Sequence, residues 1–573
     1  MLAKILTMLL GLALVLAVAC GRAAEPTAAP AAEPTTAPVE SATSQPTATP
    51  QMAAPPAEVE VNPGKVTVMI GNFGNERFDQ VFNYGGDDYG RLTHAFLIAS
   101  DVKDEKLVQI PGVATSWAIS DDGRTWSFII REGVKFHDGT ELTAEDVVWS
   151  LRHSLGPGVG EYAIRGETIT EAKIVDRIEQ TGPDQVSVTT KAPFPSFPQA
   201  VFESGPSWRG VFPKRATQHN VDEELAYDNN PIGAGPMSLT NHVPAQVMSF
   251  ERFDDYYYQP QNGFPEDKRV NFQSLDMFLV PEEATRVAAL RSGEADIVPA
   301  SLQTKEQVEA GGGRLVFGQE GTYVMGRQFG CWKPQFPCSD KRVRQALQFA
   351  LDKELMRDKL YGPEVMQIKG WGDVTPSTIG YSPELDPYPY DPAKARQLLA
   401  DAGYPGGKGF GKLVVNTWSS RSTPFLPESA QLAADFWKRE LSIDVEVRVG
   451  DEVTLKQASD LSEEIHGQII WRDNETRLDA SGKLVTQYGD PNLLNRMHND
   501  PELFALAAET SAVLDPVQRE KALNAFYRRA WEEAHIINPG YINIPWGVGP
   551  RIATWEPYPL AIYISGLRTI TLK

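Results

Sequence analysis

The chain has 573 residues and a formal net charge of −21, from 54 Lys and Arg against 75 Asp and Glu. At ~100–200 residues per domain, this length allows two to four domains. The acidic balance disfavours nucleic acid or an anionic membrane as the main partner, because basic side chains are what neutralise phosphate. With only three cysteines, the chain is not a disulfide-stapled scaffold.

Residues 1–20 are typical of a bacterial lipoprotein signal peptide. Lys4 precedes the mostly apolar run Ile5–Val18, which is shorter than the ~20 residues of a membrane-spanning helix. Small residues then lead to Cys20, which would become the lipidated first residue and an anchor in the membrane. Ala17 stands where such sites usually have Leu, so ordinary secretion with an incidental cysteine is the alternative.

Residues 21–63 repeat Ala, Pro and Thr and contain few large apolar side chains. Such a stretch buries too little surface to offset the entropy lost on ordering, and its prolines favour an extended chain. We therefore expect a disordered tether that joins the membrane anchor to a soluble, extracytoplasmic body at 64–573.

The body alternates strand and helix patterns, which predicts an α/β fold. Alternating or continuous apolar runs predict strands at Lys65–Ile70 and Trp126–Ile130, and strict alternation predicts another over 443–449. Apolar residues at helical spacing, several behind a Thr or Asp cap, predict helices that begin at Thr143, Asp340 and Asp391 and that span 427–441 and 516–534.

The body lacks the sequence signatures of a metal or phosphate site. No two histidines have the spacing of a helical metal pair, and no HExxH motif occurs. The glycine-rich stretch Gly403–Gly411 fails as a phosphate loop, because Ala402 replaces its first glycine and Gly409 replaces the Ser or Thr that follows Lys408. We expect no cofactor and no metal ion.

Cys331 and Cys338 are separated by a short Trp- and Pro-containing loop. In an exported protein this spacing favours a local disulfide, and the alternative is a pair of free buried thiols.

Ordered motifs from 111 to 399 resemble the extracellular solute-binding proteins of the peptide/nickel importer type, family 5. Physically, these residues read as turns, caps and helix starts, and we interpret Arg342 and Arg344 as charges on a helix surface. The motifs are Pro111–Trp117, Ser120–Phe128, Arg131–Thr140, Leu142–Val148, Asn230–Pro236, Glu282–Ile297, Asp340–Leu347 and Tyr390–Leu399.

The resemblance implies a two-lobed periplasmic-binding-protein clamshell of the class II type, with an extra subdomain in the first lobe. Two chain crossings near 316 and 540 would form the hinge. The implied division is a signal peptide at 1–20, a tether at 21–63, lobe I at 64–113 with 230–316 and 540–573, the extra subdomain at 114–229, and lobe II at 317–539.

The resemblance also implies the function of a non-enzymatic receptor. It would be a monomer, lipid-anchored to the outer face of the cytoplasmic membrane. It would capture a solute, in the first instance an oligopeptide, by hinge closure and deliver it to an ABC permease with a separate ATPase. The alternatives are the same role for an oligosaccharide, since aromatic side chains suit sugar faces, a peptide-sensing role, or an exported enzyme.

Candidate ligand-binding residues follow from the same resemblance. Trp471 and Asp473 occupy a segment where peptide binders of the family hold the amino terminus of the ligand, and the alternative for Asp473 is a solvated loop carboxylate paired with Arg472 or Arg477. The segment after the strand near 416 supplies Trp418, for stacking, and Arg421, for a carboxylate. Packing and a surface charge are their alternatives. Further aromatic candidates are Trp208 and Tyr84.

Overall fold

The computed structural model of the chain describes most of the predicted body, within one compact unit, Val59–Lys573. The predicted signal peptide, Cys20 and the predicted tether lie outside the described residues. Described are residues 64–573 without 80–86, 105, 156–173, 205–208, 218–226, 263, 265–267, 373, 421–422, 480, 482–483, 485–487 and 489–496.

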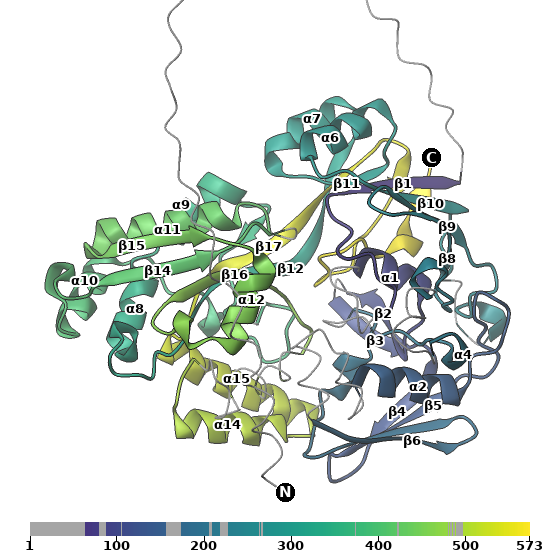
Figure 1. Cartoon of the computed structure of the whole chain (residues 1–573), viewed down its shortest axis with the longest axis horizontal. Helices are drawn as coiled ribbons and strands as arrows, with labels where there is room; N and C mark the ends of the chain where they lie inside the picture. The colour runs from purple at the N-terminus through teal and green to yellow at the C-terminus, as the bar shows by residue number, and fades with distance from the viewer. Residues whose placement is uncertain are drawn as a thin grey trace, which may run out of the picture. The chain divides into compact units, whose positions relative to one another are not determined.

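An 11-stranded mixed sheet runs through this unit (Figure 1). Its strands are β1 (Lys65–Ile70), β8 (Met237–Val243), β9 (Val247–Arg252), β10 (Ser274–Leu279), β11 (Ile297–Pro299), β12 (Arg314–Gln328), β13 (Met366–Gln367), β14 (Lys412–Thr417), β15 (Asp444–Val449), β16 (Ile469–Glu475) and β17 (Ile536–Val548). Their order is β15-β14-β16-β12-β17-β11-β1-β10-β9-β8, with β13 paired to β17 off this path. The strands predicted at Lys65–Ile70 and over 443–449 are thus confirmed.

Two long antiparallel strands, β12 and β17, connect the two halves of the sheet. They pair from Arg314 opposite Val548 to Arg327 opposite Ile536. β11 pairs with β17 near one end of this ladder, and β16 pairs with β12 near the other. We call the part of the unit around β1 and β8–β11 lobe I, and the part around β14–β16 lobe II.

The β12–β17 ladder is interrupted between the lobes. Its register shifts between Gly318 and Thr322, and Glu320, inside this interval, has a positive φ of 53°. The Glu320 carboxylate accepts hydrogen bonds from the backbone N–H and the hydroxyl of Ser377, both at 3.0 Å, which hold this irregular segment in place. The crossings that we predicted near 316 and 540 lie within these two strands.

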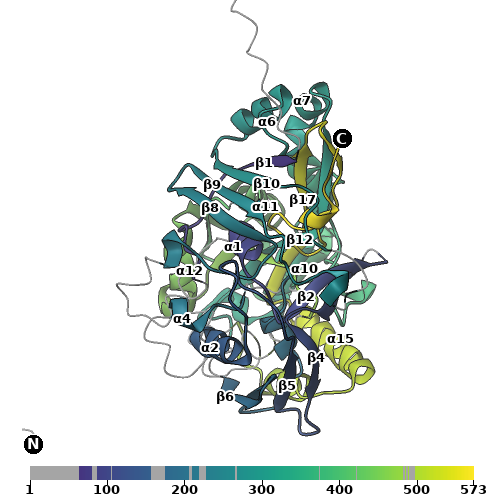
Figure 2. The ribbon, with the colours of Figure 1, turned by 90° about the vertical axis from the view of Figure 1, so that its right-hand side faces the viewer.

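A four-stranded antiparallel sheet forms a separate layer together with helix α2 (Figure 2). The predicted helix at Thr143 is confirmed as α2 (Ala144–Leu155), and it begins with a reciprocal cap. The Thr143 N–H donates to the Asp146 carboxylate at 2.9 Å, and the Asp146 N–H donates back to the Thr143 hydroxyl at 3.4 Å. The sheet has the order β4-β5-β7-β6, from β4 (Ala114–Ile119), β5 (Thr125–Ile130), β6 (Val175–Gly182) and β7 (Gln185–Thr190).

The predicted helices of lobe II are confirmed, and their Asp caps act as the sequence suggested. The carboxylates of Asp340, Asp391 and Asp515 accept hydrogen bonds from backbone N–H groups in the first turns of α8 (Lys341–Phe349), α10 (Pro392–Asp401) and α15 (Pro516–Glu533). The pattern over 427–441 becomes α11 (Leu426–Leu441). Figure 1 shows α8, α10 and α11 beside β14 and β15.

The other elements are short. The helices are α1 (Asp87–Thr93), α4 (Lys214–Thr217), α6 (Glu283–Ser292), α7 (Lys305–Ala310), α9 (Lys353–Met356), α12 (Glu452–Leu461) and α14 (Pro501–Ser511). The remaining strands are β2 (Ile98–Lys103), β3 (Lys106–Pro111), β18 (Ile552–Thr554) and β19 (Thr571–Leu572). In the described part of the chain, no helix has the length and apolar character needed to cross a membrane.

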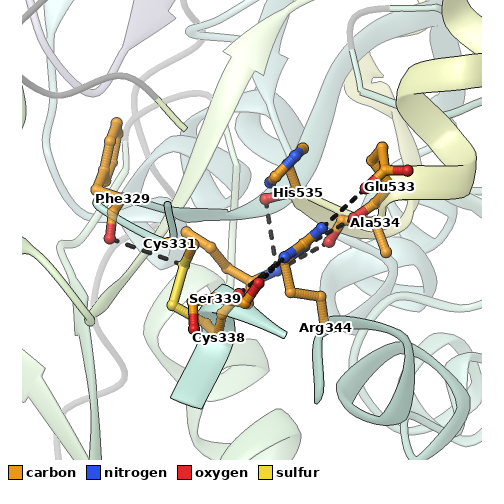
Figure 3. The surroundings of a disulfide bond; sticks show 9 residues. Phe329, Cys331, Cys338, Ser339, Arg344, Glu533, Ala534 and His535 are labelled. Atoms are coloured by element: carbon orange, nitrogen blue, oxygen red, sulfur yellow. Dashed lines mark hydrogen bonds and ion pairs between the residues drawn. A yellow bond between two sulfur atoms is a disulfide. The ribbon is translucent and has the colours of Figure 1, made fainter. Parts of the chain in front are cut away.

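Cys331 and Cys338 form a disulfide immediately before α8, with their Cα atoms 5.0 Å apart (Figure 3). The Arg344 side chain reaches the same loop from α8. Its Nη1 donates to the backbone carbonyls of Cys338, at 2.9 Å, and Ser339, at 3.1 Å. The loop is therefore held both by the covalent bond and by this guanidinium.

Arg344 is not the surface charge that we expected. Its side chain is 4% exposed, its Nε donates to the Glu533 carbonyl at 2.7 Å, and its Nη2 lies 3.1 Å from the Glu533 carboxylate. Burial lowers the pKa of Arg344 to about 10, against the opposing effect of the Glu533 charge. The expectation was wrong because the C-terminal end of α15 covers this face of α8. Arg342 is exposed as expected and pairs with Asp340.

Candidate functional site

A cavity of about 480 Å³ is lined by residues of both lobes and of β17. Several of these residues directly follow strands that run parallel to a neighbour. Gly71 and Asn72 follow β1, Ser301 follows β11, and Ser419 and Ser420 follow β14. Ligands of open α/β sheets bind at these carboxyl ends, in sites of ~300–1,000 Å³. This cavity is therefore the candidate ligand site.

Three charged residues contribute to the lobe I wall: Asp88 of α1, and Glu283 and Arg286 from the first turns of α6. The Glu283 carboxylate is held by two hydroxyls, since its Oε1 accepts from Ser301 Oγ at 2.7 Å and from Thr304 Oγ1 at 2.8 Å. The wall thus presents a negative and a positive group on the same face of one helix.

The Arg286 guanidinium is buried, with 7% of the residue exposed. Its Nη1 donates to the carbonyls of Val280 and Pro281, both at 2.7 Å. Burial lowers the pKa of Arg286, while the charges of Glu283 and Glu282 act in the opposite direction. The side chain is thereby fixed against the turn that leads from β10 into α6.

One side of the cavity is apolar and aromatic. Ile544, Pro545 and Trp546 of β17 line it together with Tyr563. Trp546 packs edge-on against Trp555, with ring centroids 5.6 Å apart, and its indole N–H has no hydrogen-bond partner among the described residues. Such a surface suits apolar side chains of a ligand.

The lobe II wall is formed by Ser419, Ser420 and Pro424, just beyond β14. The Ser420 hydroxyl donates to the Asp473 carboxylate, so that this carboxylate lies directly behind the wall. Asp473 is on β16 and 8% exposed, which rules out the solvated loop carboxylate that we considered. Arg472 donates to the Asp473 backbone carbonyl, at 3.2 Å.

The predicted aromatic residues Trp418 and Trp471 are buried and are not among the residues that line the cavity. Cations of Arg472 and Lys456 lie 5.7 Å from the Trp418 ring centroid. The Trp471 indole donates to Ser429 Oγ at 2.8 Å, inside lobe II.

Three further predicted ligand residues, Arg421, Trp208 and Tyr84, lie outside the described residues. Among the predicted residues that the structure describes, Asp473 accepts a side-chain hydrogen bond from a residue that lines the cavity, Ser420.

The sequence interpretation missed Glu283, Arg286 and Ser301. The first two belong to the motif Glu282–Ile297, which we interpreted as specifying only the fold. A usable signal was present, because polar residues that follow a strand and open a helix often face a ligand in α/β proteins. Whether the strand runs parallel to its neighbour cannot be read from that segment alone.

His94 and His242 each lie within hydrogen-bond distance of a residue from a distant part of the chain. His94 Nε2 lies 2.7 Å from the Tyr227 hydroxyl, and His242 Nε2 lies 2.8 Å from Glu76. Within the described residues, no group of three or more His, Cys, Asp or Glu side chains is placed to hold a metal ion.

Residues 109–491 match the family model described as Bacterial extracellular solute-binding proteins, family 5 Middle. Among curated proteins, the chain is similar to the glutathione-binding protein GsiB of Pectobacterium atrosepticum, with 28% identity over 381 residues. That match covers 66% of this chain and 66% of the relative.

Solved structures share the fold. The periplasmic binding protein DppA from Helicobacter pylori, in complex with peptide STSA, matches with a TM-score of 0.70 and 19% identity, over 89% of this chain and 98% of that one. The binding protein AgaA from A. tumefacien R10, in complex with agropinic acid, matches with a TM-score of 0.70 and 23% identity, over 89% and 99%. These likenesses confirm the predicted two-lobed α/β fold.

Proposed function

Because the chain belongs to the bacterial extracellular solute-binding proteins of family 5, we propose that it captures short peptides outside the cytoplasm for an ABC importer. Members of this family are transport receptors and not enzymes, and their binding domains are extracytoplasmic. In the proposal, the peptide-loaded receptor acts as a monomer and delivers its ligand to a membrane permease.

The composition of the cavity is the observation that carries this proposal. A carboxylate, Asp473, lies behind the lobe II wall, a guanidinium, Arg286, lies in the lobe I wall, and apolar side chains of β17 also line the cavity. A short peptide offers an ammonium group, a carboxylate and apolar side chains to such a site. The volume of about 480 Å³ favours short peptides over long ones.

The same geometry favours a peptide over an oligosaccharide. Sugar sites use exposed aromatic faces, but Trp418 and Trp471 are 1% and 0% exposed and do not line the cavity. Trp546, which does line it, is 3% exposed and packs against Trp555.

Hinge closure is the proposed mechanism. The irregular segment of β12 around Glu320 lies between the parts of the ladder that belong to the two lobes. A ligand favours the closed form only through contacts that are better in that form. Charged groups on opposite walls of the cavity provide such contacts, because one ligand can touch both walls only when the lobes approach each other.

A ligand panel tests the proposal. Thermal unfolding of the purified protein is followed with trialanine, glutathione or maltotriose, and the ligand is recovered afterwards. We expect trialanine and glutathione to raise the unfolding temperature, by an amount that corresponds to ~2.7 kcal/mol at a hundred times the dissociation constant. Stabilisation by maltotriose alone would favour the sugar receptor, and recovery of chemically altered peptide would indicate an enzyme.

The proposal includes anchoring through Cys20, with 21–63 as the tether. Replacing Cys20 with Ser is expected to move the protein from the membrane fraction to the soluble fraction and to abolish labelling by radioactive palmitate. A Cys331→Ser variant, which keeps Cys20, is the control and stays with the membrane. Unchanged partition of the Cys20→Ser variant would contradict lipid anchoring.

A further inference from the structure

Arg286 is a buried cation that lacks a carboxylate partner. It is 7% exposed, yet no carboxylate oxygen in the described part of the chain lies within 4.0 Å of its guanidinium nitrogens. Arg344, by contrast, has Glu533 at 3.1 Å, and Arg551 has Asp296 at 3.0 Å. Burying an unpaired charge is costly, so the Arg286 site is suited to a negative group supplied from outside.

The hydrogen bonds that Arg286 makes to described residues use only Nη1, and its Nε is a buried atom without a hydrogen-bond partner among these residues. Nη1 is used by the carbonyls of Val280 and Pro281, whereas Nε and Nη2 make no hydrogen bond to the described residues. Nε and Nη2 together form an edge with which arginine binds a carboxylate through two parallel hydrogen bonds. A Cβ atom on Gly71 would lie 3.2 Å from Nη1, so the glycine allows the guanidinium to approach β1 closely.

Arg472 is another buried arginine without an ion pair to a described carboxylate, but it differs from Arg286 in its position relative to the cavity. Arg472 faces the Trp418 ring, 5.7 Å from its centroid, and does not line the cavity. Arg286 does line it, on the wall opposite Ser420 and Asp473. A carboxylate group of a ligand in the cavity therefore has access to Arg286.

We infer that Arg286 is the carboxylate anchor of the cleft, and that lobe I thereby selects solutes with a free carboxylate, such as the C-terminus of a short peptide. This inference rests on the proposed peptide function. Glu283, on the same wall, repels a second carboxylate at this position, so lobe I accepts one carboxylate of a ligand there. Asp473 is the matching anchor for an ammonium group on lobe II, so a zwitterionic ligand connects the two lobes and stabilises closure.

The test compares trialanine with its C-terminal amide by isothermal titration calorimetry. We expect the wild-type protein to bind the free acid at least tenfold more tightly than the amide. Arg286→Gln is expected to weaken the free acid at least tenfold, to leave the amide unchanged, and so to remove the preference. Arg286→Lys keeps the charge but not the planar fork, so its preference is expected to lie between the two.

Arg291→Gln is the matched control, because Arg291 is an exposed arginine on the same helix and does not line the cavity. If the wild type binds the acid and the amide equally well, the inference about Arg286 is overturned. It is also overturned if Arg286→Gln keeps the preference for the acid. Neither result contradicts the peptide function. Failure of the wild type to bind either form would overturn both. If Arg286→Gln does not fold, the test rests on Arg286→Lys. The inference is overturned if this variant prefers the free acid over the amide as strongly as the wild type does.

Discussion

Replacing Asp473 with Asn is expected to weaken the binding of trialanine by about 30-fold or more. The substitution keeps the shape of the side chain but removes the negative charge behind the Ser420 wall, where the proposal places the ammonium group of the ligand. Loss of one partner of a buried charge pair costs about 2–5 kcal/mol, which corresponds to this loss of affinity. Isothermal titration calorimetry measures it directly.

N-acetylated trialanine separates the charge effect from a general disturbance of the cleft. It has no ammonium group, so the wild type and the Asp473→Asn variant are expected to bind it equally. Asp435→Asn removes an exposed carboxylate of lobe II, on α11, and serves as the control for net charge. Unchanged affinity of Asp473→Asn for trialanine would show that this carboxylate does not hold the amine.

Replacing Glu533 with Ala is expected to lower the free energy of unfolding by about 3 kcal/mol or more. The Glu533 carboxylate is the ionic partner of the Arg344 guanidinium, whose side chain is 4% exposed and which also holds the disulfide loop (Figure 3). Removing the carboxylate leaves that charge buried and uncompensated. Urea denaturation, followed by tryptophan fluorescence, measures the change.

The neighbouring residue supplies the control for this substitution. Glu532 is exposed, and its one ion pair with a described residue is to the exposed Arg528, so Glu532→Ala is expected to change the free energy of unfolding by less than about 0.5 kcal/mol. Equal effects of the two substitutions would mean that Arg344 does not depend on the Glu533 carboxylate.

The pKa of Glu533 gives the pH dependence of this contribution. Burial acts to raise the pKa, but hydrogen bonds from Arg529 and Lys341 and their charges outweigh it and hold the pKa below its ordinary value. A carboxyl group with a lowered pKa in the folded state stabilises the protein above its unfolded pKa and loses this effect as the pH falls through the folded pKa. The difference between wild type and Glu533→Ala is therefore expected to be full at neutral pH and to shrink in acid.

The net charge of the chain and the charge of its cleft have different consequences. The value of −21 describes the chain as a whole and disfavours polyanionic partners. The cavity holds Arg286 together with the carboxylates of Glu283 and Asp88 on one wall, and the Asp473 carboxylate lies behind the other. The affinity for a small zwitterion depends on these local groups, because surface charges are screened within about 8–10 Å at physiological salt.

Several helices and strands of this protein could be predicted from the sequence, because the interactions that form them involve residues close together in the chain. Asp391 and Asp515 cap helices with their own carboxylates. The alternation over 443–449 gives β15 one apolar face, which is buried at Val445 and half-buried at Val447. A side-chain cap and a repeat of two or 3.6 residues act within a few positions of the chain, so they can be read without knowledge of any partner.

The burial of individual side chains depended on distant partners instead. Trp418 and Trp471 have the residue type expected of a ligand platform, yet lobe II packs around both. Arg344 has the spacing of a surface residue, yet the end of α15 covers it. These outcomes depend on which helix or strand packs against a position, and that partner can lie almost two hundred residues away.

Ordered motifs and local patterns in the sequence specify the family, the two-lobed α/β fold and several of the helices and strands of the described body. Which residues form the cavity follows from the tertiary structure alone. Asn72, Ser301 and Ser420 are far apart in the chain. Parallel pairing places the carboxyl ends of β1 and β11 side by side in lobe I, and β14, which runs the opposite way in the sheet, ends at the same cavity from lobe II. Arg286 became visible as a candidate anchor only there, since its burial and its lack of a carboxylate partner among the described residues are properties of the folded chain.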